Sequence, residues 1–305
     1  MDEFVSIGVS MTTRKPMTGD EDLIIRARRL RQAGRGRDAL ALLRYTQNQM
    51  RSRRMSTLPW VQIQLAVLSR YAGQYSRTAQ LLSAAQVSAN RSGNHVAELW
   101  VAAQSLELDR VKGNFSNVAK FCELANDMRA ANDFAGVAWC LNAAAQSLLN
   151  RGVPSLARTL FSESYESARS GDDGAEAGWA SRGIAESSLR IGSIGDADKW
   201  IRIAQLHFES LGYSNGLAYV DRTIASIQIS QGESALALET CMTGLRRTGL
   251  EKRTRGYLHM TASRAASQIG AGEASLATGV HASQLFRQIG VSPPNRQGLF
   301  LPPTS

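Results

Sequence analysis

The residues best suited to chemistry form one stripe: Trp179, Arg182, Glu186 and Arg190. Steps of three and four residues bring side chains to the same face of an α-helix. An indole ring beside guanidinium and carboxylate groups can anchor a charged partner, since aromatic and arginine residues often dominate interfaces. The charged members could instead form a local salt-bridge lattice of small stabilising value. The stripe therefore predicts binding, with a purely structural role as the alternative.

Residue types that carry out catalysis do not gather in this sequence. The four histidines, at positions 95, 207, 259 and 281, do not pair with cysteine or carboxylate at metal-ligand spacing. The sequence contains no phosphate-binding Gly-x-x-x-x-Gly-Lys-Ser/Thr loop and no Gly-x-Ser-x-Gly elbow. We therefore expect no enzymatic activity, no metal site and no cofactor.

Equivalent stripes recur along the chain, each starting at an aromatic residue. The fourth copy adds asparagine and glutamine, and the sixth adds Arg222 after Tyr219. Asn and Gln can hydrogen-bond a peptide backbone. The predicted partner-binding groove comprises Trp60, Trp100, Trp139, Asn142, Gln146, Asn150, Trp179, Arg182, Glu186, Arg190, Tyr219 and Arg222. The regular aromatic column could equally seal the contacts between neighbouring units, so packing and recognition both stay open for it.

The elements that position these stripes follow from a repeating glycine. It returns every 39 or 40 residues, at Gly34, Gly73, Gly113, Gly152, Gly192, Gly232 and Gly272. Thirteen residues before it lies the aromatic column, which continues to His259 in the seventh copy. Such a period is the signature of stacked repeats. The sequence therefore contains about seven units.

Each unit is predicted to be a helical hairpin. Phe134, Leu141, Ala145 and Leu148 share one face of a helix that ends before Gly152. Glycine tolerates the left-handed turn at a helix C-terminus, and a proline such as Pro154 suits the start of the next helix. No long alternation of polar and apolar residues indicates a strand. The predicted fold is an all-α solenoid of about seven helix-turn-helix repeats.

The turn of each unit resembles that of the tetratricopeptide repeat. Gly73, Gln74 and Tyr75 match its glycine-x-aromatic pattern, as do residues 113–115, whereas residues 192–194 and 232–234 depart from it. The period exceeds the family's common 34 residues and is similar to the long variant in sensor regions of bacterial regulators, such as the maltose-regulon activator and ATPase-type regulators. The resemblance covers roughly residues 21–291. It implies a right-handed superhelix whose concave groove is lined by the first helix of each pair.

The ends of the chain differ from the repeats. We expect residues 1–20 to be disordered, residues 21–291 to form the superhelical domain, and residues 292–305 to form a flexible tail. Pro293, Pro294, Pro302 and Pro303 prevent a continuing helix in this tail.

Composition suggests a cytoplasmic protein without membrane contact. No run of 18 apolar residues could span a bilayer, and Asp2 and Glu3 stand where a signal peptide would be basic. Three cysteines at unrelated spacings predict no disulfide framework. Cys122 and Cys241 share a second-helix column with apolar residues and are expected in the core.

The net charge of +9 is concentrated near the N-terminus. Residues 1–70 hold 13 Lys and Arg against 6 Asp and Glu. The basic patch comprises Arg26, Arg28, Arg29, Arg31, Arg35, Arg37, Arg51, Arg53 and Arg54. It could attract nucleic acid or an acidic partner. It could also be the solvated outer face that a terminal repeat requires.

The sequence therefore favours a non-enzymatic scaffold or adaptor that binds a protein or peptide in its concave groove. One alternative is a ligand- or peptide-responsive regulatory module that acts on a partner in trans. Another is binding of nucleic acid or an acidic partner through the basic first repeat.

Overall fold

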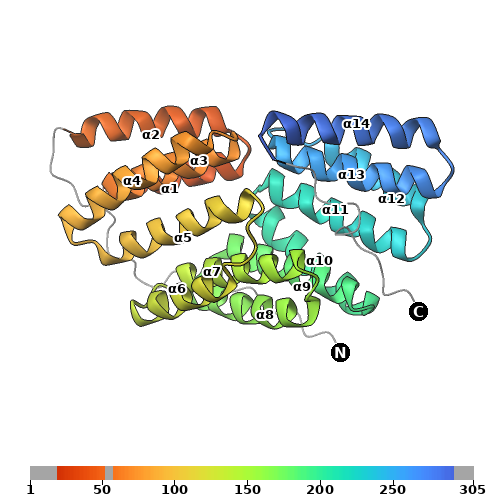
Figure 1. Ribbon diagram of the computed structural model, residues 1–305, viewed down its shortest axis with the longest axis horizontal. Helices are drawn as coiled ribbons and strands as arrows, with labels where there is room; N and C mark the ends of the chain where they lie inside the picture. The colour runs from red at the N-terminus through yellow and green to blue at the C-terminus, as the bar shows by residue number, and fades with distance from the viewer. Residues whose placement is uncertain (1–18, 52–57, 292–305) are drawn as a thin grey trace.

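The structure, a computed structural model, describes residues 19–51 and 58–291 (Figure 1). In these ranges the chain forms fourteen α-helices and no β-strand. The helices are α1 (Gly19–Gln32), α2 (Gly36–Arg51), α3 (Leu58–Tyr71), α4 (Tyr75–Ser92), α5 (His95–Val111), α6 (Val118–Ala130), α7 (Phe134–Asn150), α8 (Pro154–Ser170), α9 (Gly174–Arg190), α10 (Ile194–Ser210), α11 (Ser214–Ser230), α12 (Ser234–Leu245), α13 (Lys252–Gln268) and α14 (Gly272–Gln288). Successive helices pack as hairpins, so the predicted solenoid of seven helix pairs is confirmed.

Two expectations from the sequence concern the chain ends and membranes. Residues 1–18 and 292–305, which include most of the predicted disordered segment and the whole tail, lie outside the described residues. Across the described helices, none combines the length and the apolar character that a membrane crossing needs.

A left-handed glycine makes the turn inside each hairpin. Gly152, for example, has φ +78°, a conformation that glycine adopts without steric cost. In the seventh pair the left-handed residue is Gly270 at φ +75°, whereas Gly272 is the first residue of α14. The predicted seventh position is therefore wrong by two residues. The reason is that α13 begins 20 residues after Gly232, whereas α11 begins 22 residues after Gly192.

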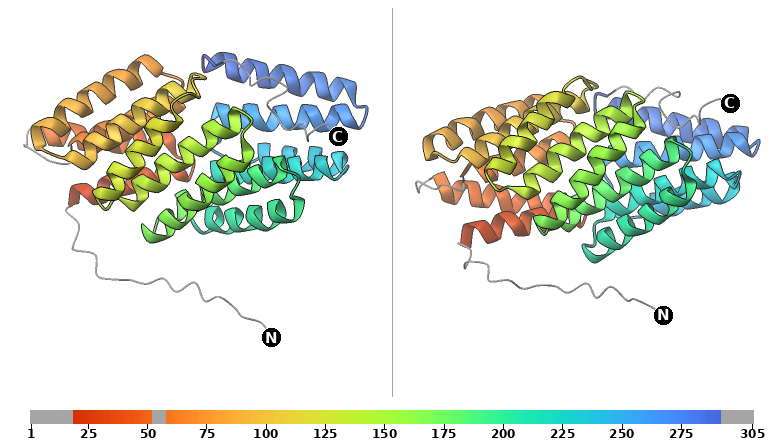
Figure 2. Two further views of the ribbon diagram at one scale, coloured as in Figure 1. Left: turned by 60° about the horizontal axis from the view of Figure 1, so that its bottom comes forward. Right: turned by 90° about the horizontal axis from the view of Figure 1, so that it is seen from below.

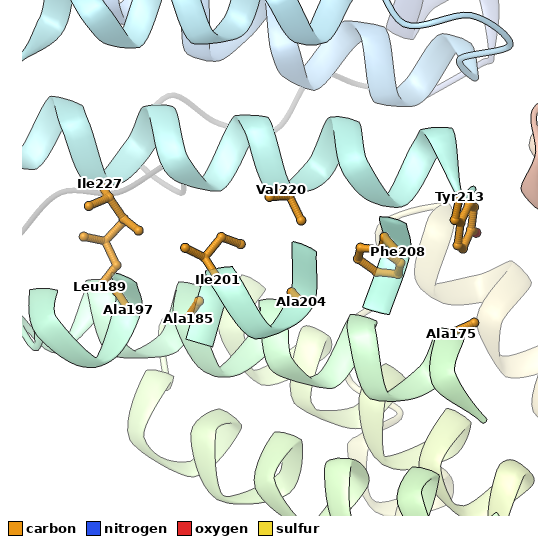
Figure 3. Packing of buried hydrophobic residues seen from close by; sticks show 10 residues of the cluster. All are labelled: Ala175, Ala185, Leu189, Ala197, Ile201, Ala204, Phe208, Tyr213, Val220 and Ile227. Carbon is orange, nitrogen blue, oxygen red and sulfur yellow. The ribbon is translucent and has the colours of Figure 1, made fainter. Parts of the chain in front are cut away.

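Phenylalanines of the second helices fill space that glycines leave on the first helices. Phe208 of α10 is fully buried in an apolar cluster with Ile201 and Tyr213 (Figure 3). A Cβ atom at Gly216 of α11 would lie 2.6 Å from the Phe208 ring, so only glycine lets that ring seat. Gly183 of α9 accommodates Phe161 in the same way. Close helix approach therefore depends on these small residues.

The two cysteines predicted for the core differ. Cys241 is fully buried. Cys122 is only partly buried, because Phe121 takes the core position of α6. Helix α6 begins at Val118, farther beyond its turn glycine than the other second helices begin beyond theirs. The core position of α6 therefore falls one residue earlier than in the other second helices.

The superhelix curves until its first and last parts meet. The N-terminal helices, in red and orange, lie beside the C-terminal helices, in blue (Figures 1 and 2). A Cβ atom at Gly34 would lie 2.9 Å from the Cα of Gly249, and one at Gly73 would lie 3.0 Å from the Cα of Ile289. We call Gly34, Gly73, Thr248, Gly249 and Ile289 the closure seam. The solenoid is therefore bent into a nearly closed ring.

We predict that Gly34→Ala opens the closure seam. The change costs about 1–2 kcal/mol for the left-handed backbone and also drives a methyl group into Gly249. Gly192→Ala is the matched control, because Gly192 has φ +83° but an added Cβ would meet no atom of the described residues within 4 Å. Urea unfolding and small-angle X-ray scattering should show a larger stability loss or a larger radius of gyration for Gly34→Ala. Equal stability losses with identical scattering would contradict the seam.

Candidate functional site

The concave side of the superhelix encloses a cavity of about 630 Å³. Its wall is made mainly by the first helix of each pair, from α1 to α13. All twelve residues predicted for the groove line it: Trp60, Trp100, Trp139, Asn142, Gln146, Asn150, Trp179, Arg182, Glu186, Arg190, Tyr219 and Arg222. The structure brings them together around one space, and their role in binding stays a prediction.

Aromatic side chains follow this wall in two rows of neighbouring rings. Their neighbouring ring centroids are 6.4 Å apart for Trp60 and Trp100, 5.6 Å for Trp100 and Trp139, 5.3 Å for Trp179 and Tyr219, and 6.0 Å for Tyr219 and Tyr257. The rings therefore pack on the next repeat and are also half-buried at the cavity surface. One orientation is fixed further, since the Trp100 indole donates a 2.6 Å hydrogen bond to Asp133.

In the seventh pair the cavity-facing ring belongs to Tyr257, two residues before the predicted His259. The shift matches that of the left-handed glycine in the same pair. His259 instead contacts His281 of α14, with ring centroids 5.4 Å apart. Tyr257 is thus a cavity residue that the strict 40-residue spacing misses.

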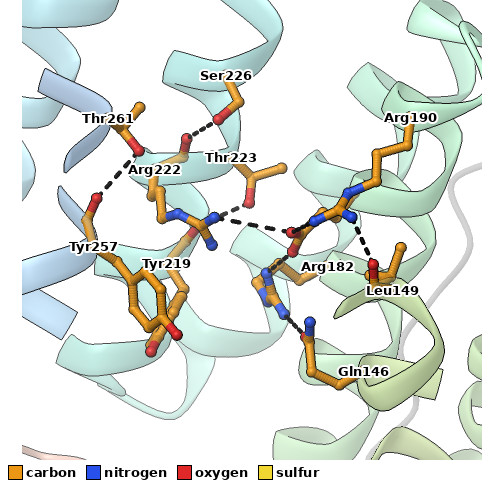
Figure 4. A network of polar contacts seen from close by, with 12 residues as sticks. Gln146, Leu149, Arg182, Arg190, Tyr219, Arg222, Thr223, Ser226, Tyr257 and Thr261 are labelled. Atoms are coloured by element: carbon orange, nitrogen blue, oxygen red, sulfur yellow. Dashed lines mark hydrogen bonds and ion pairs between the residues drawn. The ribbon is translucent and has the colours of Figure 1, made fainter. Parts of the chain in front are cut away.

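Three guanidinium groups surround the Glu186 carboxylate; they belong to Arg182, Arg190 and Arg222, which are labelled in Figure 4. This carboxylate accepts from Arg182 at 2.5 Å and from Arg190 at 3.3 Å, and Arg222 of α11 approaches to 3.9 Å. Arg182 also donates to Gln146 at 2.9 Å, and Arg190 to the backbone carbonyl of residue 149 at 2.7 Å. Burial alone would raise the pKa of Glu186, but the three guanidinium groups outweigh it and lower this pKa to about 2. The carboxylate is therefore ionised at any ordinary pH.

A second cluster surrounds Glu107 of α5. Arg110 donates to this carboxylate twice, at 2.6 and 2.8 Å, and Arg70 of α3 donates once, at 3.0 Å. The two arginines overcome burial and hold the pKa of Glu107 below its usual range. The predicted groove omitted Arg70 and Arg110. Each follows its tryptophan by ten residues, so extending the helical stripe to that position would have found them.

A third cluster of polar side chains connects α1 to α9. Arg28 pairs with Asp173 at 2.8 Å, and Asp173 caps α9 through the backbone N–H groups of residues 175 and 176. Glu176 accepts a 2.9 Å hydrogen bond from Asn142. Burial and the nearby Asp173 carboxylate raise the pKa of Glu176 to about 7, although Asn142 and Arg28 oppose the shift. This group therefore titrates near neutral pH.

The fold is also found among solved structures. It is similar to the crystal structure of a Rap protein complexed with Competence and Sporulation Factor, with a TM-score of 0.60 at 10% sequence identity. The alignment covers 89% of this chain and 87% of that one. No protein-family model and no curated protein sequence matches the chain. The chain has a helical-repeat fold.

The structure divides the predicted basic patch. Arg28 and Arg31 turn inward and line the cavity, where Arg31 donates to Tyr71 at 3.3 Å. The exposed members are Arg26, Arg29, Arg35 and Arg37. Arg35 pairs with Asp38 at 2.7 Å. Arg53 and Arg54 lie outside the described residues, as does the side chain of Arg51.

Among the described residues, arginines outnumber acids in the cavity wall. The lining includes eight arginines (Arg28, Arg31, Arg70, Arg110, Arg182, Arg190, Arg222 and Arg253) and five acids (Glu107, Asp133, Glu176, Glu186 and Glu251). Burial also raises the pKa of Glu251. Over residues 19–51 and 58–291, no three His, Cys, Asp or Glu side chains gather as a metal site would require. The wall is therefore electropositive and suits ligands that contain oxygen acceptors or negative charge.

We predict that Glu176→Gln makes folding less sensitive to pH. The folded state holds the Glu176 proton more tightly than the unfolded state, so the wild type loses stability as pH rises from about 4.3 to about 7. Glutamine stays neutral and still accepts from Asn142. Urea unfolding should show the variant gaining about 2–3 kcal/mol over the wild type between about pH 5 and pH 8. Parallel curves for the two proteins would rule out this titration.

Proposed function

We propose that this protein binds a short, extended peptide inside the ring. The observation that carries the proposal is the cavity of about 630 Å³, whose wall combines aromatic rings with buried polar groups. Ligand sites of this volume range bury most of a small ligand and orient it with a few polar groups. The protein would act by holding the peptide and not by altering it.

The polar side chains of the wall favour one kind of peptide partner. An extended segment exposes its backbone N–H and C=O groups, and amide side chains such as that of Asn142 can hydrogen-bond to them. In an α-helix most of these backbone groups bond to one another. We therefore favour an extended peptide over a partner helix.

Asn142 supplies a specific group for such a backbone. It is only 9% exposed, and its amide nitrogen donates to Glu176. Its Oδ1 atom is buried and has no hydrogen-bond partner among the residues that the structure describes. A buried acceptor without a partner is costly. A peptide N–H group would satisfy it. The neighbouring Trp139 and Trp179 rings offer apolar surface to the peptide side chains.

The solved structure of similar fold supports this proposal by analogy. The Rap protein in that crystal structure is complexed with Competence and Sporulation Factor, so a helical-repeat superhelix of this kind can hold a bound partner. At this level of sequence identity the analogy extends to the fold alone.

The regulatory alternative draws on the ring closure. A ligand that contacts α1, α9 and α13 together would stabilise the closure seam, which ties ligand binding to the shape of the outer surface. A partner that recognises the closed ring would then respond to the ligand. Nucleic-acid binding through the first repeat has less support, because Arg28 and Arg31 face the cavity.

We predict that filling the cavity abolishes peptide capture. The wild-type protein is mixed with a degenerate pool of linear pentapeptides, and retained peptides are identified by mass spectrometry after gel filtration. Gln64→Trp places an indole at the cavity wall and should lose the retained peptides. Gln284→Trp makes the same change on the exposed face of α14 and should retain them.

Loss of peptides in both variants, or in neither, would place binding elsewhere. If the wild type retains no peptide, peptide binding in the cavity is wrong.

A further inference from the structure

Two arginines of the cavity wall differ from the other six. Six of the eight pair with a carboxylate: Arg28 with Asp173, Arg70 and Arg110 with Glu107, and Arg182, Arg190 and Arg222 with Glu186. Within residues 19–51 and 58–291, Arg31 and Arg253 form no ion pair with a carboxylate. Their hydrogen bonds go to neutral oxygen atoms, two phenol hydroxyls and one backbone carbonyl.

Both of these guanidinium groups are held at one turn of the closure seam. Arg31 of α1 donates to the Tyr71 hydroxyl at 3.3 Å. Arg253 of α13 donates to the Tyr75 hydroxyl at 3.2 Å. The two tyrosines stand two residues before and two residues after Gly73, whose turn joins α3 to α4. The first and the last helix pair therefore each bring one guanidinium group to the same end of the cavity.

Neighbouring groups fix the position of each guanidinium. That of Arg31 lies 5.3 Å from the ring centroid of Tyr71, and Arg70 lies 4.8 Å from the same centroid. Arg253 makes a second hydrogen bond, of 3.3 Å, to the backbone carbonyl of residue 111. A carboxylate or phosphate group matches the planar fork of arginine with two parallel hydrogen bonds, which a single phenol or carbonyl oxygen cannot do. The two side chains are accordingly preorganised for an oxyanion.

Glu251 is the carboxylate that acts on both arginines from a distance. Its side chain makes no hydrogen bond or ion pair with the part of the chain that the structure describes. Burial raises the pKa of Glu251, although Arg31, Arg70 and Arg253 oppose this shift. Even when Glu251 is ionised, one carboxylate faces the two guanidinium groups that lack an ion pair among the described residues. A second oxyanion would complete their pairing.

We propose that Arg31 and Arg253 together bind an oxyanion group of the cavity ligand, and that this anion holds the ring closed. The oxyanion is a carboxylate or a phosphate, because both present paired oxygen atoms to a guanidinium group. Once bound, it connects α1 to α13 and thereby the first helix pair to the last. Where the ligand is the peptide proposed above, its carboxylate is the oxyanion, and the inference then rests on the proposed function.

Isothermal titration calorimetry with small probes tests the site. Succinate and inorganic phosphate are the two anions, and neutral succinamide is the reference. The wild type should bind at least one of the anions and should not bind succinamide. The anion that binds more tightly assigns the ligand class. Arg31→Gln and Arg253→Gln should each weaken its binding at least tenfold, and a wild type that binds neither anion would overturn the proposal.

Three further variants separate anion binding from a structural role. Tyr75→Phe removes the hydroxyl that Arg253 donates to but keeps the guanidinium group, so it should retain the affinity of the wild type. Glu251→Gln removes the nearby negative charge and should bind the anion at least threefold more tightly. Arg202→Gln, on the exposed face of α10, is the matched control and should bind as the wild type does. Unchanged affinity in Arg31→Gln, loss of binding in Tyr75→Phe or weaker binding in Glu251→Gln would overturn the site.

Hydrogen exchange tests the effect of the anion on the ring. The bound anion should slow exchange of the backbone amides in residues 71–75 and in the first turn of α13, because it links these two segments. The turn around Gly192 is the internal reference and should exchange at an unchanged rate. Equal exchange of both segments with and without the bound anion would overturn the link to ring closure.

Peptide pools separate this inference from the proposed function. Retention of free-acid peptides but not of C-terminal amides would assign the oxyanion to the peptide C-terminus. Retention of amides that contain Asp or Glu would assign it to a side chain. Retention of peptides regardless of their carboxylates would preserve peptide binding and overturn the oxyanion site. Anion binding through the two arginines without retained peptides would preserve the site and overturn peptide binding.

Discussion

Close approach of helix backbones is the constraint on which this structure depends. The first helices carry alanine where they meet the second helices, and Ala145, Ala185, Ala225 and Ala265 are all fully buried. Where a phenylalanine ring such as that of Phe208 packs against a first helix, that helix carries glycine in place of alanine. Tight and similar packing in every pair gives each repeat a similar rotation, and the rotations add along the chain. The ring and its enclosed cavity result from this accumulated curvature.

Enclosure changes the chemistry of the inner wall. On an open solenoid face, Arg182 and Glu186 would form an exposed ion pair of little consequence. Inside the ring both are nearly inaccessible to water, with side chains 6% and 2% exposed. Electrostatic interactions strengthen in such surroundings, and so does the cost of any imbalance. The same helical spacing therefore yields a buried polar site in place of a solvated ion pair.

The sequence predicts features within one repeat better than contacts between repeats that lie far apart in the chain. The left-handed turn at Gly152 and the stripe from Trp179 to Arg190 follow from spacing within one unit, and both appear in the structure. A fixed period misaligns the seventh unit, because α13 begins two residues closer to Gly232 than α11 does to Gly192. The same shift hides Tyr257 from the aromatic column.

Contacts across the ring could not be predicted at all. The pairing of Arg28 with Asp173 and the approach of Gly34 to Gly249 join residues that lie in different repeats. They depend on how far each unit rotates, which is a property of three-dimensional packing and leaves no periodic signal in one sequence. The sequence therefore groups Arg28 and Arg31 with the other arginines of the basic patch, whereas in the structure both line the cavity.

The Gly34–Gly249 contact also bears on how this architecture could evolve. Open solenoids lengthen and shorten readily, because an extra unit merely extends a free end. Here the two ends of the array meet, so duplication or loss of one internal hairpin would rotate the last helices away from their glycine partner. Copy number is consequently a fixed property of the molecule, as it is for the blades of a closed propeller, and variation is left to the side chains of the inner wall.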